Sequence, residues 1–220
     1  IDPTEGDTMD KNKKAMYDKS GPRVAENFRK RHFEAYYCSD KETACQKVLE
    51  LIPPEDTVSW GGSLTLRELG VRELLAERGN PVIDRDAAGS PEERNDLMRQ
   101  ALTCDTFLMS TNALSMDGQL VNIDGNGNRV AAMIYGPKSV IVIAGMNKTA
   151  STVESAWVRA RNTAAPMNTQ RFDIKTPCTV TGQCGDCKSE DCVCAYMVTT
   201  RICRPPKKIK VVLVGEDLGM

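Results

Sequence analysis

The 220-residue sequence predicts an α/β protein whose mostly parallel sheet is flanked by helices. Two observations lead to this fold class. Strand-like and helix-like segments alternate along the chain, as they do where helices connect parallel strands. The run SVIVIAG, residues 139–145, is continuously apolar, which is typical of a central strand covered on both faces. The length is enough for one large domain with its own core.

The N-terminal region is expected to be a linker followed by helices. Residues 1–22 are interpreted as disordered, as a linker or as a cloning remnant. Residues 23–52 are expected to form N-terminal helices, because apolar side chains recur there near helical spacing and residues 39–40 offer an N-cap for a second segment. The α/β domain would span residues 23–220, with these helices and a cysteine-rich insertion at residues 176–203.

Apolar periodicity and turn signals predict the elements that follow. Strands are expected at residues 56–60, 80–84, 104–110, 139–145 and 208–216. Helices are expected at residues 63–79, 90–102 and 151–166, and a short helix or a turn at residues 128–137. Ser90 followed by Pro91 is typical of a helix start, and Ser151 is expected to cap the last helix. Asp117-Gly118, between two partly alternating runs, predicts a β-hairpin.

The overall charge gives no sign of a nucleic-acid or membrane partner. The chain has 29 basic and 30 acidic residues, so it creates no strong global field. It has no apolar run near the roughly 20 residues that span a bilayer, and its first residues lack the apolar core of a secretory signal. We therefore expect a cytoplasmic protein with no nucleic-acid and no membrane partner. The single histidine, His32, excludes a zinc-hydrolase site built on several histidines.

The segment SWGGSLT, residues 59–65, is the first candidate for a ligand site. A strand, a glycine turn and a helix follow one another there, a layout that directs backbone N–H groups at an anion. Gly61 and Gly62 would let the backbone approach a ligand, and Ser63 and Thr65 add hydroxyl groups. The segment matches neither the dinucleotide fingerprint nor the P-loop motif. A tight turn capped by Ser63 is the alternative.

The segment NIDGNGNR, residues 122–129, is the second candidate, since it is far more polar than the end of a hairpin requires. Arg129 is the residue that would pair with a carboxylate or phosphate. Asp124 is the candidate acid or base. The alternative is a turn in which Asn and Asp side chains bond their own backbone. The similarity to a calcium loop is incomplete, because the full spacing and the terminal glutamate are missing.

Six of the nine cysteines gather near the C-terminal end of the sequence. They are Cys178, Cys184, Cys187, Cys192, Cys194 and Cys203. A reducing compartment disfavours disulfides, and a chain of this length does not need them. Four thiolates suit a zinc ion or an iron–sulfur cluster, and Cys184-x2-Cys187 also matches a redox pattern, so iron–sulfur, zinc and metal-free redox thiols all stay open. Cys38, Cys45 and Cys104 stand apart and are interpreted as small buried hydrophobes.

Four stretches, taken in this order, resemble the LUD-domain family, whose proteins are associated with lactate utilisation. They are VSWGGSLTLRELG, TNALSMDGQLVNIDGNGNRVAAMIYGP, the cysteine segment and VVLVGEDLG. The resemblance runs from about Arg23 to the end of the sequence, and NIDGNGNR with TGQCGDC is its most specific part. It is strongest to the compact branch of the family that carries a C-terminal cysteine segment.

This resemblance implies a fold like that of the sugar-phosphate isomerase and CoA-transferase superfamily (NagB/RpiA/CoA transferase-like), with an anionic small molecule at the strand ends. The ligand-binding positions it implies are Gly61, Gly62, Ser63, Thr65, Asn112, Asn126 and Asn128, beside Asp124 and Arg129 as catalytic candidates. The metal-binding positions it implies are Cys178, Cys184, Cys187 and Cys194. Cys192 departs from the family pattern, which expects a basic residue there. No counterpart of the CoA-transferase glutamate is found, so transferase chemistry does not follow from the fold.

The leading hypothesis is a protein that binds a small anionic metabolite, such as an organic acid, a sugar phosphate or an acyl-CoA, and takes part in lactate or organic-acid utilisation. Whether it is an enzyme stays open. One rival hypothesis is an iron–sulfur redox accessory subunit, with partners in a lactate-oxidation complex. Another is a structural module whose C-terminal loop is ordered by zinc. A homo-oligomer is compatible with each of them.

Overall fold

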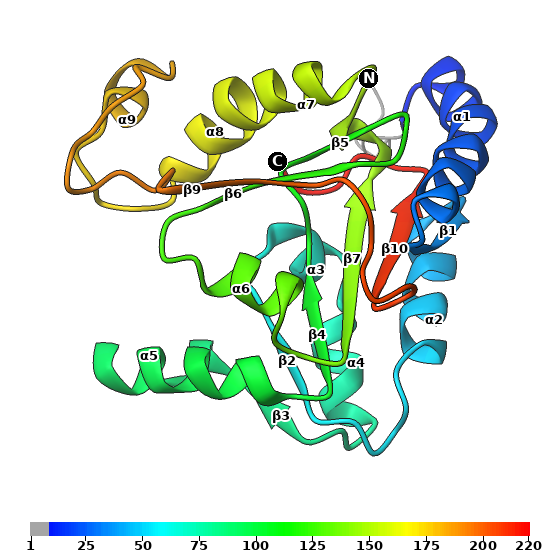
Figure 1. The fold of residues 1–220 in the computed structure, drawn as a ribbon, viewed down its shortest axis with the longest axis horizontal. Coiled ribbons are helices and arrows are strands. Elements are labelled where there is room, and N and C mark those ends of the chain that lie inside the picture. Colours follow the sequence, from blue (N-terminus) through cyan, green and yellow to red (C-terminus); the bar gives the residue numbers. More distant parts are fainter. Residues whose placement is uncertain (1–8) are drawn as a thin grey trace, which may run out of the picture.

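A six-stranded parallel sheet forms the centre of the protein, and this confirms the expected α/β class. The computed structural model describes residues 9–220, shown in Figure 1. The strand order is β1-β10-β7-β4-β2-β3. The strands are β1 (Glu34–Cys38), β2 (Val58–Trp60), β3 (Val82–Ile83), β4 (Thr106–Met109), β7 (Ser139–Gly145) and β10 (Ile209–Val214). Strand β7 lies between β10 and β4, so the apolar run 139–145 is an interior strand as expected.

Helices cover both faces of this sheet. Val140 and Val142 of β7 belong to the core that includes α1 (Lys11–Lys30) and α6 (Asn128–Ile134), whereas Ile141 and Ile143 face the opposite core. The opposite core includes α2 (Lys41–Glu50), α3 (Leu64–Leu69) and α4 (Val71–Glu77). Side chains that alternate between two covered faces explain why this strand is apolar throughout. No helix within residues 9–220 combines the length and apolar composition needed to cross a bilayer.

A second, smaller sheet crosses the carboxyl ends of the main strands (Figure 1). Its strands are β8 (Thr149–Ala150), β5 (Ala113–Ser115), β6 (Leu120–Asp124) and β9 (Tyr196–Thr200), in that order. Strands β5 and β6 are antiparallel around Asp117-Gly118, so the predicted hairpin is confirmed. Gly118 has a φ of 89°, and a Cβ there would lie 2.7 Å from the backbone nitrogen of Phe28, so the turn needs glycine.

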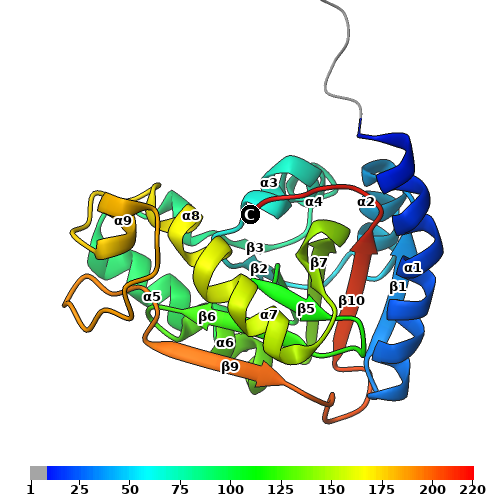
Figure 2. The same cartoon turned by 90° about the horizontal axis from the view of Figure 1, so that it is seen from above.

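One long helical segment packs on this second sheet (Figure 2). It consists of α7 (Val153–Arg159), a π-helical turn (Ala160–Ala164) and α8 (Ala165–Thr169). Alanines on its inner side meet Ala113, Val121 and Ile123 of the sheet. The remaining helices are α5 (Pro91–Gln100) and α9 (Pro177–Thr181), with 3-10 turns at Arg85–Ala87, Ala101–Thr103 and Met146–Lys148.

The structure corrects the prediction for the N-terminal region. Helix α1 begins at Lys11, so part of the expected linker 1–22 is helical, while residues 1–8 lie outside the described residues. The expected helices at 23–52 are interrupted by β1, which pairs with β10. His32, with a φ of 66°, lies beyond the last turn of α1. The strand sequence EAYYC is rich in aromatic residues that favour strands, and its pairing with β10 outweighs the weak helical spacing.

Three smaller expectations also differ. The helix predicted at 63–79 divides at Gly70, whose φ of 69° is left-handed and breaks the helical path between α3 and α4. The cap of α7 is Thr152, whose side chain accepts from the backbone nitrogen of Ser155, and not Ser151. Strand β9 was not predicted. Its residues are largely exposed along one edge of the second sheet, so they carry little apolar signal.

Candidate functional site

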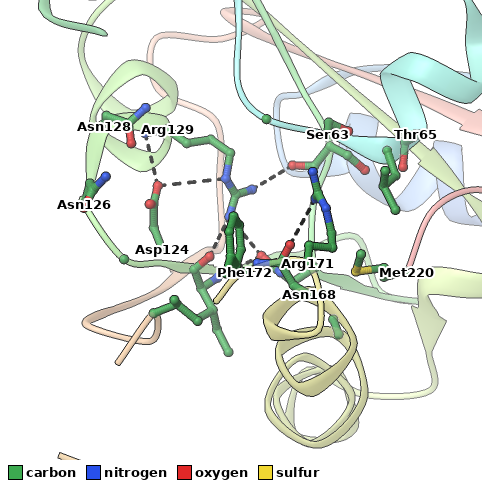
Figure 3. A pocket seen from close by; sticks show the side chains of 18 of the residues that line it. Ser63, Thr65, Asp124, Asn126, Asn128, Arg129, Asn168, Arg171, Phe172 and Met220 are labelled. Carbon is green, nitrogen blue, oxygen red and sulfur yellow. Dashed lines mark hydrogen bonds and ion pairs between the residues drawn. The ribbon is translucent and has the colours of Figure 1, made fainter. Parts of the chain in front are cut away.

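A cavity of about 480 Å³ lies where the carboxyl ends of the main strands meet the second sheet. Its walls come from the turn after β2, the connection between β4 and β5, the loop after β6 and the end of the α7–α8 segment. Figure 3 shows Asp124 and Arg129 on one side of it and Asn168, Arg171 and Phe172 on the other. Ligands in open parallel sheets bind at this edge, because the strand-end loops converge there.

Cationic side chains dominate the wall of this cavity. They are Arg67, Arg85, Arg94, Arg129, Lys148 and Arg171, six in all. The anionic side chains in the wall are two, Asp86 and Asp124. A partly enclosed site with this excess of positive charge attracts anions, because charges in a region of low dielectric are poorly screened.

Arg129 is a hub between the two sheets. Its Nη1 donates to the carbonyl of Ser110 at 2.8 Å and to Oδ1 of Asn122 at 2.7 Å. Its Nη2 donates to Oδ1 of Asn112 at 2.9 Å and to the carbonyl of Ile123 at 2.7 Å. Ser110 follows β4 of the main sheet, whereas Asn122 and Ile123 belong to β6 of the second sheet. The guanidinium therefore fixes one sheet to the other.

These contacts give Arg129 a structural role beside the ligand-binding role that the sequence predicts. The side chain does lie beside the diglycine turn, since a Cβ added at Gly61 would be 3.1 Å from its Cδ. Each of its four terminal N–H groups, however, has a protein acceptor, so none is left to clamp a carboxylate or phosphate. Burial lowers the pKa of Arg129, and Asp124 opposes that shift. Arg129 thus positions the cavity wall, and its expected contact with a ligand stays a prediction.

Asp124 is also engaged by the protein itself. Its Oδ1 accepts from the backbone nitrogen of Gly127 at 3.3 Å. Its Oδ2 accepts from the backbone nitrogens of Arg129 and Val130, each at 3.1 Å. The carboxylate thus caps the start of α6, as in the alternative in which the polar loop bonds its own backbone. The acid or base role of Asp124 stays a prediction.

The diglycine turn lies against the cavity, but its hydroxyl groups have protein partners. Ser63 caps α3, because its Oγ accepts from the backbone nitrogen of Leu66 at 3.3 Å, as the plain-turn alternative expected. Thr65 is buried and its Oγ1 accepts from Lys148. A side chain at Gly62 would collide with Nη2 of Arg85, so this glycine admits the arginine to the wall.

The three asparagines named from the family resemblance all line the cavity, in two different ways. Asn112 supports the hub, since its Oδ1 accepts from Arg129 and from the backbone nitrogen of Ile123. Asn126 and Asn128 lie in the loop that leads into α6, beside Asp124 (Figure 3). Within residues 9–220 their side chains make no hydrogen bond to protein, and Asn126 is exposed whereas Asn128 is half-buried, so both amides have donors and acceptors free.

Lys148 is a site residue that the sequence analysis missed. It is 4% exposed, and its Nζ donates to Oγ1 of Thr65 and to Oγ of Ser110, both at 2.9 Å. Burial lowers the pKa of Lys148 to about 7, with smaller contributions from the positive charges of Arg159 and Arg129. The available signal was its position, because Lys148 follows the interior strand β7 directly at the carboxyl edge.

Arg85 and Arg171 were missed as well. Arg85 approaches Asp86 at 3.7 Å and Sδ of Met98 at 3.3 Å, and its Nε is buried without a hydrogen-bond partner in the described chain. Burial is the main cause that lowers the pKa of Arg85. Arg171 donates to Asn168 at 3.2 Å and is otherwise exposed at the mouth of the cavity. Both arginines sit in loops whose paths no local pattern predicts.

The cysteine segment brings its thiols near one another without forming a finished metal site. Burial raises the pKa of Cys194 to about 12, and the nearby thiols Cys192, Cys184, Cys178 and Cys187 raise it further. Within residues 9–220, however, no three His, Cys, Asp or Glu side chains converge closely enough to hold a metal ion. The donors suit zinc or an iron–sulfur cluster in kind, but this arrangement does not fit either.

The other cysteines are separate from this cluster. Cys203 is 1% exposed in the main core, where its Sγ accepts from the backbone nitrogen of Ile209 at 3.3 Å. Cys38, Cys45 and Cys104 are buried, as expected for small hydrophobes. The cluster therefore contains the remaining five thiols, and all nine cysteines are free.

Comparisons with known proteins identify relatives of this chain. The family model described as the LUD domain matches residues 22–214. A DUF162 family protein from Deinococcus radiodurans has a similar structure, with 10% identity, a TM-score of 0.52, and coverage of 90% of this chain and 98% of the other. Ribose 5-phosphate isomerase A from Neisseria gonorrhoeae is a more distant match, with 16% identity, a TM-score of 0.34, and coverage of 51% and 54%. No curated protein sequence matches the chain.

The hub role of Arg129 predicts a large loss of stability on a substitution that keeps its charge. Arg129→Lys leaves several buried acceptors without donors, and we expect the free energy of unfolding to fall by about 2–4 kcal/mol. Urea denaturation followed by circular dichroism measures this change. Arg99→Lys is the matched control, because Arg99 lies on the exposed side of α5 and, within residues 9–220, pairs with Asp96 alone. If both substitutions lower the free energy of unfolding by the same small amount, Arg129 does not hold the two sheets together.

The buried amine of Lys148 predicts a specific pH dependence of stability. Between about 7, its folded pKa, and the ordinary lysine value of 10.5, the unfolded chain binds a proton that the folded chain does not. The free energy of unfolding should therefore rise with pH in this window, by up to about 1.4 kcal/mol per pH unit. Lys148→Met has no titratable amine at this position, so its free energy of unfolding should not rise with pH in this way. The difference in free energy of unfolding between Lys148→Met and the wild type should therefore shrink as pH rises.

Urea denaturation of both proteins across this pH window tests the sign of that difference. Lys138→Met is the control, since Lys138 is exposed and its removal should leave the pH profile parallel to the wild type. A Lys148→Met profile that is also parallel to the wild type would show that the amine titrates normally.

Proposed function

The chain belongs to the LUD-domain family, and on that premise we propose that its cavity binds a small anionic metabolite. The observation that carries the proposal is the charge of the wall, with six cationic side chains against two carboxylates. Buried or half-buried charges need partners, because desolvation is expensive when it is not repaid. An anionic ligand would supply the missing partner.

The cation excess is greatest around Asp86. This one carboxylate faces Arg72 at 3.1 Å, Arg94 at 3.3 Å, Arg85 at 3.7 Å and Arg67 at 4.0 Å. Although burial raises its pKa, the arginines outweigh that effect and hold the pKa of Asp86 below its ordinary value. Asp84 also pairs with Arg72 at 3.3 Å, so two carboxylates face four arginines. Because positive charge is still in excess, this rim is the place where a carboxylate or phosphate would bind.

Arg85 is the strongest candidate for direct contact with the anion. It lies over Gly62, its Nε has no hydrogen-bond partner in the described chain, and its best neighbour apart from Asp86 is a weakly accepting methionine sulfur. The free amides of Asn126 and Asn128 line the same cavity and would add hydrogen bonds. The size of the cavity falls in the range of small-molecule sites.

The ligand class that these features favour is an organic acid, a sugar phosphate or an acyl-CoA. All three carry a carboxylate or phosphate that an arginine-rich wall recognises. The family name links its members to lactate utilisation, which favours an organic acid or a metabolite close to one.

Isothermal titration with lactate, pyruvate, a sugar phosphate and an acyl-CoA tests the proposal. We expect at least one of them to bind, and Arg85→Gln to weaken that binding about tenfold or more, a loss of about 1.4 kcal/mol. Arg99→Gln is the control, because it removes a positive charge from the exposed side of α5. If no anion binds, or if Arg85→Gln and Arg99→Gln bind it equally, the cavity is not an anion site.

The cysteine segment supports a second candidate function, as a metal or redox centre. The observation that favours it is the gathering of four other thiols near Cys194, all of which raise its pKa. Iron–sulfur ligation would make the protein a redox accessory subunit, whereas zinc would make the segment a structural element. Cys178, Cys184, Cys187 and Cys194 are the proposed ligands, and they must come closer together than in this structure to hold a metal.

Metal analysis of protein purified without air decides between an iron–sulfur cluster and a zinc ion. We expect one equivalent of zinc in a colourless protein, or iron with sulfide in a brown one, and a loss of the metal in Cys187→Ser. Cys45→Ser is the control, because Cys45 is a buried thiol of α2 outside the segment. A metal-free protein, or metal retained in Cys187→Ser, would contradict ligation by these thiols.

A further inference from the structure

Lys148 has the surroundings of a reactive amine. Resting on the proposed function of the cavity, we propose that Lys148 is a catalytic residue that forms a covalent iminium with the carbonyl carbon of an anionic substrate. The substrate class is an aldehyde or ketone that also carries a carboxylate or a phosphate.

The first step is the position of the amine. Lys148 lines the same cavity as the arginines, directly beyond the end of β7, and its Nζ is held by the hydroxyl groups of Thr65 and Ser110. Two hydroxyls use two of the three directions around Nζ. The third N–H of Nζ has no hydrogen-bond acceptor within residues 9–220, and Lys148 borders the cavity.

The second step is the charge around the amine. A lysine with a structural role is normally paired with a carboxylate, but no carboxylate of the described residues forms an ion pair with Nζ. The charged groups that act on it are Arg159 of α7 and Arg129 of α6, with Glu68 of α3 as the opposite charge of smallest effect. Burial and neighbouring cations both favour the neutral amine, which is the nucleophilic form, and its pKa of about 7 agrees with this.

The third step is the location of the anion. The arginine rim around Asp86 and the amine of Lys148 border one cavity, so an anionic group held at the rim leaves the rest of the molecule in the same enclosure as Nζ. Ser110 connects the amine to the hub, because its Oγ accepts from Lys148 and its carbonyl accepts from Arg129. The amine is therefore held rigidly, as nucleophilic catalysis requires.

The chemistry balances without an oxidant or a reductant. The lone pair of neutral Nζ attacks the carbonyl carbon and the C=O π bond breaks. One proton moves from the nitrogen to the oxygen through the hydroxyl of Thr65 or Ser110, which gives a neutral carbinolamine. Loss of that oxygen as water, with one further proton supplied from solvent through the hydroxyls of Thr65 or Ser110, forms the C=N bond of the iminium. Addition of water reverses the sequence and returns the free lysine.

Reductive trapping tests this step. The wild-type protein is incubated with cyanoborohydride and either pyruvate, which carries a carboxylate, or glyceraldehyde 3-phosphate, which carries a phosphate. Peptide mapping by mass spectrometry then locates the reduced adduct. With at least one of the two probes we expect Lys148 to be modified about tenfold or more above the exposed Lys138 in the same sample, which serves as an internal reference for non-specific labelling.

Lys148→Arg keeps the positive charge but forms no iminium, so labelling above the Lys138 level should disappear, while Lys138→Arg should leave the labelling of Lys148 intact.

Equal labelling of Lys148 and Lys138 by a probe that titration shows to bind overturns the iminium but leaves the anion site standing. If titration shows that neither carbonyl probe binds while lactate or the acyl-CoA does, the carbonyl substrate class is wrong and the anion site again survives. If no anion binds at all, both proposals fail.

Discussion

The guanidinium of Arg129 is the contact on which the rest of the site depends. It lies where the main sheet passes into the second sheet, and its four hydrogen bonds join Ser110 and Asn112 on one side to Asn122 and Ile123 on the other. A lysine could satisfy only part of this set, because its ammonium lacks the planar fork. The cavity exists because the two sheets are held at this junction, with the strand ends of both facing inward.

The same junction explains why the site is electrostatically unbalanced. Arg129 and Arg159 use their donors on backbone and side-chain oxygens of the junction, so their positive charges are fixed in place but not cancelled. Lys148 then lies beside two cations with only hydroxyl groups as direct partners. Such an arrangement lowers stability compared with paired charges, and proteins retain it where a function uses the unbalanced field.

The sequence predicted the parts of the fold that depend on local patterns. The apolar run of β7, the Asp117-Gly118 hairpin and the glycine turn after β2 all lie where expected, because each is encoded by neighbouring residues. The protein contacts of the site side chains were not predicted. Arg129 and Asp124 were expected to meet a ligand, which stays a prediction, and both also bond to the protein through contacts that depend on the path of the chain between the two sheets. Lys148 and Arg85 were missed for the same reason. They reach the site only through tertiary packing.

The cysteine segment and the cavity share a wall, so the two candidate functions are structurally coupled. Val193, between Cys192 and Cys194, lines the cavity, and the backbone of Val193 lies 3.4 Å from the position of a Cβ at Gly125. On the other side, Cys178 contacts Oγ1 of Thr169 at the end of α8, next to the loop that carries Arg171. Any rearrangement that brings the thiols to one centre must move these backbones, because packed segments shift together. The thiol segment and the wall of the cavity are therefore in direct contact at two places.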